Sequence, residues 1–420
     1  MMDGLMSMRQ RRSVARIAGI LLLATSVGCG DSGSPAIYDC PELVGSWASP
    51  EYEALAVHSD GSSEVLSGLS MTMEVTEQVG CNFRAETIWG NDEVGGREPV
   101  AGRIHLNGRE VTLLDLPGAG ATGRVVGTLV GEKFSWAYAG LSDEDRRAVV
   151  FETTLARVGS GDIEPTPACP DVSGSWNSEI YEALRQDGAG PRRILEGLSM
   201  TLEVEEQVGC TFRGVNRWSN GEIGGEEVVA GVMRGDRETF TIVELGPHPV
   251  GGTRASVTAW LNGEDMEWAY TGLAVAGDYG TVFRSKLSRT GPTRLNATCP
   301  DIRGDWRSGR YEALAVASGG AARTITGLEM VLRVDFQEGC MFSGANEWNN
   351  GEIGGVEPIV GVIYGEGREL SIVEIGEPPE GGSAGLVTGI RIGEDRMEWD
   401  YAGLAVDGSQ AIVFGVELER

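Results

Sequence analysis

The sequence predicts an all-β protein made of three tandem eight-stranded antiparallel up-and-down β-barrels joined by short linkers. Three observations lead to this prediction: a threefold repeat of cysteine and tryptophan positions, alternation of apolar and polar residues, and glycine-bearing turns between short segments. Of the 420 residues, 63 are glycine and 41% are hydrophobic, a composition typical of folded domains and not of a disordered chain. A β-sandwich in each module is the alternative architecture.

The first residues predict an export signal. Four arginines between Arg9 and Arg16 precede an apolar stretch, Ile17 to Val27, that is too short to span a bilayer. The stretch ends Ser26-Val27-Gly28-Cys29, which resembles a bacterial lipobox, although Ser26 stands where leucine is usual. The resemblance implies a lipoprotein signal peptide over residues 1–28, lipidation of Cys29 and a tether over residues 29–39. We therefore expect a lipid-anchored protein of the bacterial cell envelope, at the outer membrane or cell surface; a plain secretory signal with an incidental cysteine is the alternative.

Three copies of one module fill the remaining chain. Cys40, Cys169 and Cys299 are 129 and 130 residues apart, and a second cysteine in each copy repeats these spacings. Nine of the ten tryptophans occupy three positions written three times. Stretches rich in glycine, proline, serine and threonine separate the copies and predict linkers. The predicted modules are residues 40–158, 169–289 and 299–420, each the size of a self-contained domain.

The seven cysteines consist of Cys29, the predicted lipid anchor, and three pairs, one pair in each module. Apart from Cys29, the cysteines lie 41 residues apart within each module, and we predict the disulfides Cys40–Cys81, Cys169–Cys210 and Cys299–Cys340. Cys-x-x-Cys motifs and Cys/His clusters do not occur in the sequence, so we predict no metal site, and we also expect no cofactor. Disulfides are typical of compartments outside the cytoplasm.

The first module predicts its eight strands in chain order. Leu69 to Thr76 alternates apolar and polar residues without interruption, as a strand with one buried face does. The other predicted strands are 45–56, 82–89, 98–106, 110–116, 122–130, 133–139 and 147–157. Tight turns follow at 79–80, 107–108 and 131–132, which places them at one end of the barrel, and longer connections at 57–67, 90–97, 117–121 and 140–146 lie at the other.

Each module opens with Gly-x-Trp and closes with an arginine. The tryptophans are Trp47, Trp176 and Trp306, and the arginines are Arg157, Arg289 and Arg420. This pattern resembles the calycin barrels, the group of the lipocalins and avidins. The resemblance implies that the arginine lies over the tryptophan and plugs one end of the barrel. It covers that closed end and not a ligand site.

The other end of each predicted barrel carries recurring aromatic and acidic residues. They are a tryptophan followed by Asn-x-Glu-x-Gly-Gly, an acid that ends strand five and a tyrosine on strand seven. The candidate ligand-binding residues are Trp89, Glu93, Asp115 and Tyr138, then Trp218, Glu222, Glu244 and Tyr270, and then Trp348, Glu352, Glu374 and Tyr401. Aromatic walls with a few carboxylates suit a sugar, a cationic molecule or an amphiphile. Core packing and turn capping explain the same pattern without a ligand.

Charge and histidine placement narrow the function. A net charge of −28 argues against a nucleic-acid partner. The three histidines occupy non-equivalent positions, so a histidine site common to the modules is excluded. We expect a non-catalytic binding module for small ligands in the barrel mouths, held at the membrane through its N-terminal lipid. The alternatives are a structural or adhesive surface stalk with filled barrels that binds an envelope partner, and a hydrolase using carboxylates such as Glu53 and Glu93.

Overall fold

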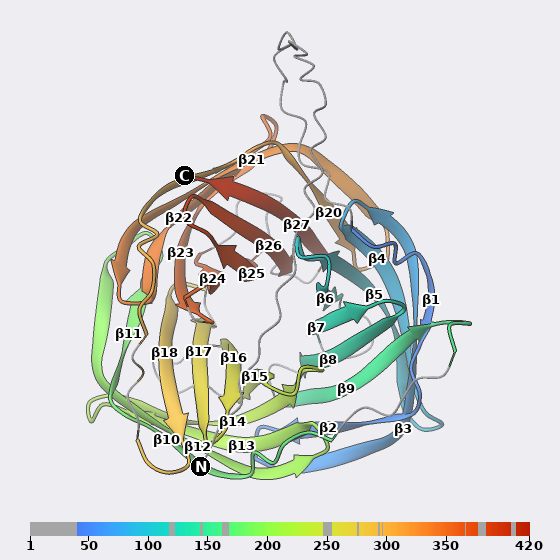
Figure 1. The fold of residues 1–420 in the computed structure, drawn as a ribbon, viewed down its shortest axis with the longest axis horizontal. Coiled ribbons are helices and arrows are strands. Elements are labelled where there is room, and N and C mark those ends of the chain that lie inside the picture. Colours follow the sequence, from blue (N-terminus) through green and yellow to red (C-terminus); the bar gives the residue numbers. More distant parts are fainter. Residues whose placement is uncertain are drawn as a thin grey trace, which may run out of the picture. The chain divides into compact units, whose positions relative to one another are not determined.

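The computed structural model describes residues 40–420 except 117–121, 143–145, 162–167, 247–253, 275–276, 293–294, 296, 366, 377–383 and 405–408. The predicted signal peptide, the tether and Cys29 lie outside the described residues. Residues Pro35–Arg420 form one compact unit. Every described element in it is a β-strand (Figure 1). Among the described residues there is no helix long and apolar enough to cross a membrane.

The strands fall into three sheets of nine. Barrel 1 comprises β1 (Gly45–Ala48), β2 (Tyr52–His58), β3 (Ser63–Val79), β4 (Asn82–Gly90), β5 (Gly95–Ile104), β6 (Glu110–Asp115), β7 (Thr122–Val130), β8 (Lys133–Ser142) and β9 (Arg147–Arg157). Barrel 2 comprises β10 (Gly174–Ser178), β11 (Tyr181–Gln186), β12 (Arg192–Val208), β13 (Thr211–Ser219), β14 (Gly224–Met233), β15 (Thr239–Leu245), β16 (Arg254–Asn262), β17 (Asp265–Leu273) and β18 (Gly280–Ser288). Barrel 3 comprises β19 (Gly304–Ser308), β20 (Tyr311–Ala317), β21 (Ala322–Glu338), β22 (Met341–Asn349), β23 (Gly354–Tyr364), β24 (Glu369–Glu374), β25 (Ala384–Ile392), β26 (Arg396–Leu404) and β27 (Gln410–Glu419).

Each sheet closes on itself. In barrel 1 the consecutive strands from β3 to β9 pair as antiparallel neighbours, and β1 and β2 both pair with β3 and with β9. Barrels 2 and 3 repeat this order. The closed antiparallel sheets confirm the predicted up-and-down barrels and exclude the two-sheet sandwich.

The first strand of each barrel differs from the prediction, because it is broken in two. Residues 45–56 were expected to form one strand, whereas β1 ends at Ala48 and β2 begins at Tyr52. In barrel 1 the break contains Pro50, which lacks the N–H that a paired strand needs, but the breaks at 179–180 and 309–310 in the other barrels contain no proline. The Ser49 hydroxyl takes over one bond of the ladder by accepting the N–H of Met71 at 2.9 Å. Counted as one broken strand, β1 and β2 complete the predicted eight.

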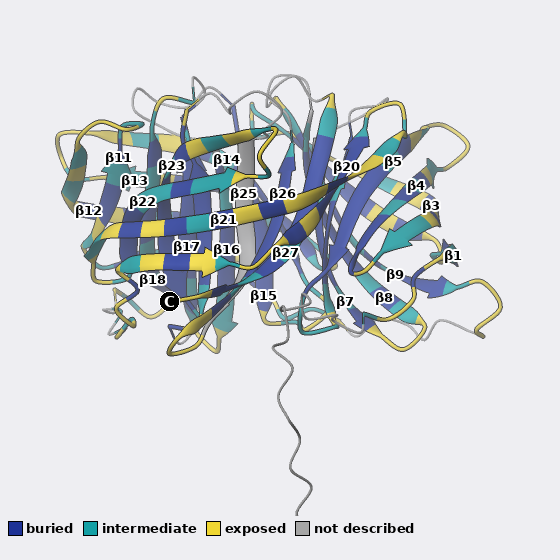
Figure 2. Cartoon of the chain, turned by 90° about the horizontal axis from the view of Figure 1, so that it is seen from above, coloured by how far each residue is buried: buried dark blue, intermediate teal, exposed yellow. Residues whose placement is uncertain are grey.

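The second strand is longer than predicted, and the loops at its end of the barrel are shorter. Strand β3 spans Ser63–Val79, not 69–76, and the connections expected at 57–67 and 90–97 shrink to 59–62 and 91–94. The alternation of buried and exposed residues that marks β21 in Figure 2 covers mainly the second half of these long strands. The first half is largely exposed, so it lacks the pattern that the prediction relied on.

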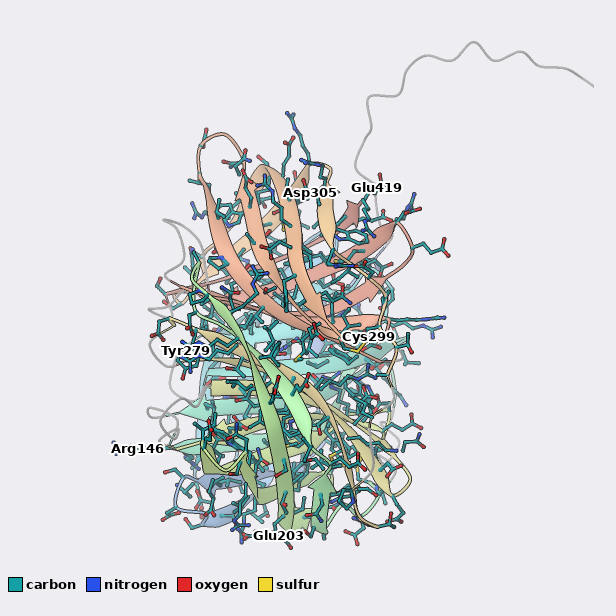
Figure 3. The ribbon with its side chains drawn as sticks, turned by 90° about the vertical axis from the view of Figure 1, so that its left-hand side faces the viewer. Arg146, Glu203, Tyr279, Cys299, Asp305 and Glu419 are labelled. Atoms are coloured by element: carbon teal, nitrogen blue, oxygen red, sulfur yellow. A yellow bond between two sulfur atoms is a disulfide. The ribbon has the colours of Figure 1, made fainter. Side chains whose placement is uncertain are left out.

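All three predicted disulfides are present. The Cα atoms of the paired cysteines lie 5.3 Å apart in Cys40–Cys81 and 5.2 Å apart in Cys169–Cys210 and Cys299–Cys340. Figure 3 shows the position of Cys299. Each bridge joins the segment before the first strand to the turn before the third, at the same end of the barrel as the closing arginine.

An arginine covers the buried tryptophan at this end of each barrel. The guanidinium carbon of Arg157 lies 4.9 Å from the ring centre of Trp47, and the corresponding distances are 4.5 Å for Arg289 and 5.5 Å for Arg420. Arg157 also donates hydrogen bonds to the carbonyl oxygens of Glu42 and Val44. The arrangement is the plug that the calycin-like pattern implied.

The three barrels pack against one another through buried apolar clusters. One cluster joins barrel 1 to barrel 2 and includes Leu55, Val150 and Val243. Another joins barrel 3 to barrel 1 and includes Ala101 and Val413. The core of barrel 2 extends into barrel 3 through residues such as Val360 and Val373 on the outer faces of β23 and β24. Each barrel therefore contacts both others, and the modules do not follow one another as separate beads of a stalk.

Candidate functional site

A half-buried tryptophan stands at the end of the third strand of each barrel. The indole Nε1 of Trp348 donates a hydrogen bond to Glu357 Oε2 at 2.9 Å, and Trp218 does the same to Glu227 at 3.1 Å. In barrel 1, Gly96 lies directly across from Trp89, and a Cβ at Gly96 would sit 3.1 Å from the indole ring. The second glycine of the repeated turn therefore makes room for the ring.

A second carboxyl group faces the first from the end of the fifth strand. In barrel 3, Glu374 accepts hydrogen bonds from the Tyr401 hydroxyl at 3.0 Å and from the Asn346 amide at 3.3 Å. In barrel 2, Glu244 accepts one from the Tyr270 hydroxyl at 3.2 Å. Burial raises the pKa of the corresponding tyrosine in barrel 1, Tyr138, so its phenol remains a donor at neutral pH.

The two acids form a buried carboxyl pair in every barrel. The pairs are Glu98 with Asp115, Glu227 with Glu244, and Glu357 with Glu374, and all six side chains are at least 94% buried. Burial, and then the charge of Glu227, holds the pKa of Glu244 well above its ordinary value. Burial likewise raises the pKa of Glu357 to about 7. Two adjacent buried carboxylates do not both ionise readily, so one carboxyl of each pair keeps its proton to a higher pH than an exposed acid does.

Three stacked aromatic rings form the opposite wall of each site. In barrel 3 the ring of Phe414 lies between Tyr311, at 4.9 Å, and Tyr401, at 4.7 Å. The same stack is formed in barrel 1 by Tyr52, Phe151 and Tyr138 and in barrel 2 by Tyr181, Phe283 and Tyr270. These rings come from the first, eighth and seventh strands, which are neighbours in the closed sheet.

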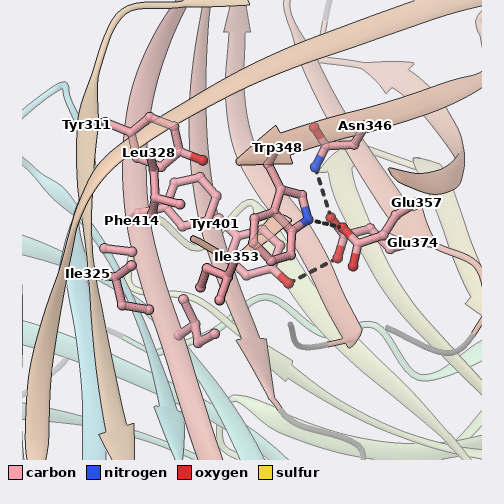
Figure 4. A pocket seen from close by; sticks show the side chains of 12 residues that line it. Tyr311, Ile325, Leu328, Asn346, Trp348, Ile353, Glu357, Glu374, Tyr401 and Phe414 are labelled. Atoms are coloured by element: carbon pink, nitrogen blue, oxygen red, sulfur yellow. Dashed lines mark hydrogen bonds between the residues drawn. The ribbon is translucent and has the colours of Figure 1, made fainter. Parts of the chain in front are cut away.

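The stack and the carboxyl pair of barrel 3 line a cavity of about 40 Å³ (Figure 4). Its other lining residues include Trp348, Ile353 and Leu328. A water molecule needs roughly 10–15 Å³ measured in this way, so the cavity accommodates a few waters or one compact small molecule.

Several buried polar atoms at these sites have no hydrogen-bond partner. They are Asp115 Oδ1 in barrel 1, Glu244 Oε1 in barrel 2 and Asn346 Oδ1 in barrel 3. An amide oxygen and the oxygens of an ionised carboxylate accept hydrogen bonds, and buried acceptors are normally paired. A ligand that completes these sites is therefore one that donates hydrogen bonds.

The structure brings together three of the four candidates that the sequence offered for each module. Trp348, Glu374 and Tyr401 line the cavity, whereas the side chain of Glu352 is exposed in the turn before β23. The backbone N–H of Glu352 donates to Asn350 Oδ1 at 3.0 Å, and Glu93 and Glu222 have the same bond in the other copies. The repeated Asn-x-Glu therefore caps a turn, as the explanation without a ligand proposed.

Sequence reasoning missed the first acid of each pair. Glu98, Glu227 and Glu357 each follow the tryptophan by nine residues, in the strand directly paired with it. Each of these acids lies an even number of residues from inward-facing apolar residues of the same strand, and this spacing could have predicted that it faces the barrel interior. The acids proposed for hydrolysis lie elsewhere: Glu53 and Glu93 are both exposed.

Among the described residues, no three histidine, cysteine, aspartate or glutamate side chains gather closely enough to hold a metal ion. The carboxyl pair has two members and so does not form such a cluster. What the site offers is an aromatic wall, a proton-sharing pair and free acceptors.

No protein-family model matches the chain, and no curated protein matches it significantly. Among solved structures, it is similar to a protein of unknown function from the DUF3598 family of Nostoc punctiforme, at 13% identity, with a TM-score of 0.27 and coverage of 59% of this chain and 96% of the other. It is also similar to a mutant transferrin binding protein B from Haemophilus parasuis, at 9% identity, with a TM-score of 0.22 and coverage of 90% and 76%. These values are too low to assign a family or a function.

Proposed function

We propose that the protein is a non-catalytic binding protein whose barrels each take one small cationic ligand, such as a compact alkylammonium ion. The observation that carries this proposal is a buried carboxyl pair facing a stack of aromatic rings in every barrel, with an unpartnered polar atom at each site, namely Asp115 Oδ1, Glu244 Oε1 and Asn346 Oδ1. Aromatic faces attract cations, and an ammonium group donates the hydrogen bonds that these acceptors lack.

The size and charge of the site select among the ligand classes considered. A cavity of about 40 Å³ is far below the roughly 300–1,000 Å³ of pockets that take larger organic ligands, which disfavours a sugar or an amphiphile. A carboxyl pair that shares one proton keeps one negative charge, and this matches a monovalent cation. Protonating Glu357 removes that charge, so binding in barrel 3 strengthens as the pH rises through about 7.

Methylammonium is expected to shift the NMR signals of the indole N–H groups of Trp89, Trp218 and Trp348. In a Glu357→Gln variant the Trp348 shift is expected to be lost, because the amide cannot carry the charge, while Trp89 and Trp218 still respond. Glu352→Gln is the matched control, since this glutamate lies five residues earlier in the turn before β23 and is exposed, and it leaves all three shifts unchanged. Unaltered Trp348 titration in Glu357→Gln contradicts the proposed site.

A structural or adhesive role with filled barrels is the second candidate. The observation that favours it is the small cavity beneath three large stacked rings. It predicts that no indole signal moves with any small cation, so the same titration separates the two functions.

We further propose that the protein is exported and held at the bacterial cell envelope by a lipid on Cys29. The basic and apolar residues before Cys29 and three disulfides support this location. A Cys29→Ser variant is expected to leave the membrane fraction and to lose incorporation of labelled palmitate. Membrane partitioning that persists in this variant would show that the lipid is not the anchor.

A further inference from the structure

The three interfaces between barrels are built from the same strands. The seventh and eighth strands of one barrel contact the fourth and fifth strands of the next (Figure 1). These contacts are β8 and β9 on β14 and β15, β17 and β18 on β23 and β24, and β26 and β27 on β5 and β6. Such head-to-tail interfaces use two different faces, and they end only when the rotation closes a cycle. Here the third interface closes the cycle by joining the last barrel to the first.

The two interfaces between consecutive barrels are apolar at their equivalent central positions. Ala137 on β8 and Val232 on β14 belong to one buried cluster, and Ala269 on β17 and Val362 on β23 belong to another. At the closing interface the same two positions hold Asp400 on β26 and Arg103 on β5. On the seventh strand the equivalent residues are the ones that directly follow the buried tryptophan: Ala137, Ala269 and Asp400. On the fourth strand they are the residues that pair with the same position of the fifth strand: Val232 with Thr241, Val362 with Ser371 and Arg103 with Thr112.

Arg103 and Asp400 form a buried ion pair between barrels 1 and 3. Arg103 Nε lies 2.5 Å from Asp400 Oδ1, and the two side chains are only 4% and 3% exposed. Arg103 also donates to Asn82 Oδ1 at 2.8 Å, and His105 Nδ1 lies 3.7 Å from Asp400 Oδ2. The charges are therefore satisfied only when these two faces meet.

A third position that differs between the modules makes room for the ion pair. Gly415 lies opposite Asp400 in the register, and a Cβ at Gly415 would come within 1.6 Å of Arg103 Nη2. The equivalent positions in the other barrels hold the long side chains Glu152 and Arg284. Three positions thus differ together at the closing interface.

We propose that the Arg103–Asp400 pair specifies which two faces close the cycle, so that the third barrel accepts the first barrel as its partner and rejects the second. The three modules present similar faces, so each face fits, by its apolar contacts, more than one partner within this chain or on a second copy. Placing Asp400 against Val232, or Arg103 against Ala137 or Ala269, buries a charge without its partner, which is strongly unfavourable. Only the contact between barrel 3 and barrel 1 pairs both charges.

The decisive variant is Arg103→Val/Asp400→Ala, which gives the closing interface the residues of the other two. It removes both buried charges together, so neither is left without its partner, and we expect it to fold even if the single variants fail. After refolding from denaturant at increasing protein concentration, the wild-type chain is expected to be monomeric by light scattering. The double variant is expected to lose much of its monomer to oligomers that grow with concentration, because mismatched faces now join.

The matched control removes an exposed ion pair at another interface between barrels. Arg192 and Asp335 lie 2.9 Å apart between barrels 2 and 3, with side chains 34% and 60% exposed. An Arg192→Ala/Asp335→Ala variant is expected to refold to monomer like the wild type. If Arg103→Val/Asp400→Ala also refolds to monomer at every concentration, the pair does not specify closure and the proposal fails.

Discussion

A Cys169→Ala/Cys210→Ala variant is expected to lose about 4 kcal/mol of unfolding free energy in barrel 2, because the bridge closes a loop of 41 residues in the unfolded chain. The folded barrel keeps its closed sheet, so the main effect is the greater conformational freedom of the unfolded state. Native-state hydrogen exchange is the suitable measurement, since it follows each barrel separately. Amide protons of β17 and β18 are expected to exchange much faster in the variant.

Barrel 3 serves as an internal control for this experiment, because its Cys299–Cys340 bridge is untouched. The interface with barrel 1 is expected to loosen as well. Arg237 Nη1 lies 3.1 Å from both sulfur atoms of the lost bridge, and its other Nη lies 3.5 Å from Glu152 of barrel 1. Exchange of the β17 and β18 amides at the wild-type rate in the variant would show that the bridge contributes little to stability.

The barrel architecture was predictable because local signals repeat in every copy. The alternation from Leu69 to Thr76 fixed a half-buried strand, and the Gly-x-Trp and arginine positions predicted the plugged end. The first half of β3 was missed because its side chains are largely exposed on both faces of the sheet, so burial imposes no alternation there. The break in the first strand was missed because periodicity does not reveal that a serine hydroxyl, that of Ser49 in barrel 1, accepts a backbone N–H there.

The packing of the barrels left a trace in the sequence that is clear only in retrospect. The fourth strand is apolar on both faces: Val100 points into barrel 1, while Ala101 belongs to the cluster shared with barrel 3. A strand of an isolated barrel has one face in water, whereas a strand covered on both sides loses its alternation. Arg103 gave no such signal, because a charge on an outward face normally indicates solvent.

The candidate site was predictable in part for a similar reason. Trp89 and Asp115 stand at strand ends and Tyr138 lies on the inner face of β8, so the topology of an up-and-down barrel brings them together. Glu98 was not predicted because the repeated Asn-x-Glu-x-Gly-Gly motif contains Glu93, five residues earlier, and ends before Glu98. The two acids differ in position. Glu93 lies in a turn, where its backbone N–H donates to Asn91, whereas Glu98 lies within the paired strand β5 and its side chain projects inward.

Glu357→Gln is expected to remove about 3 kcal/mol of pH dependence from the unfolding free energy, because burial moves the pKa of this carboxyl from 4.5 to about 7. A raised carboxyl pKa means that the folded state binds the proton more tightly than the unfolded state. Its stabilising contribution is therefore complete below pH 4.5 and is lost as the pH rises through about 7. Glutamine stays neutral throughout and keeps the volume of the side chain.

Urea unfolding of the wild type and the variant at pH 5 and pH 8 measures this effect. The quantity compared is the change in unfolding free energy between the two pH values, in the wild type and in the variant. Other carboxyls, such as Asp301, whose pKa is lowered by its bonds to Arg303, add a pH dependence of opposite sign. Carboxyls that lie away from the Glu357–Glu374 pair contribute equally to both proteins and cancel. The variant is expected to gain stability relative to the wild type on going from pH 5 to pH 8, whereas the exposed control Glu352→Gln is expected to gain none. A wild-type minus Glu357→Gln difference that is the same at both pH values would mean that Glu357 is ionised throughout, and the carboxyl pair would then share no proton.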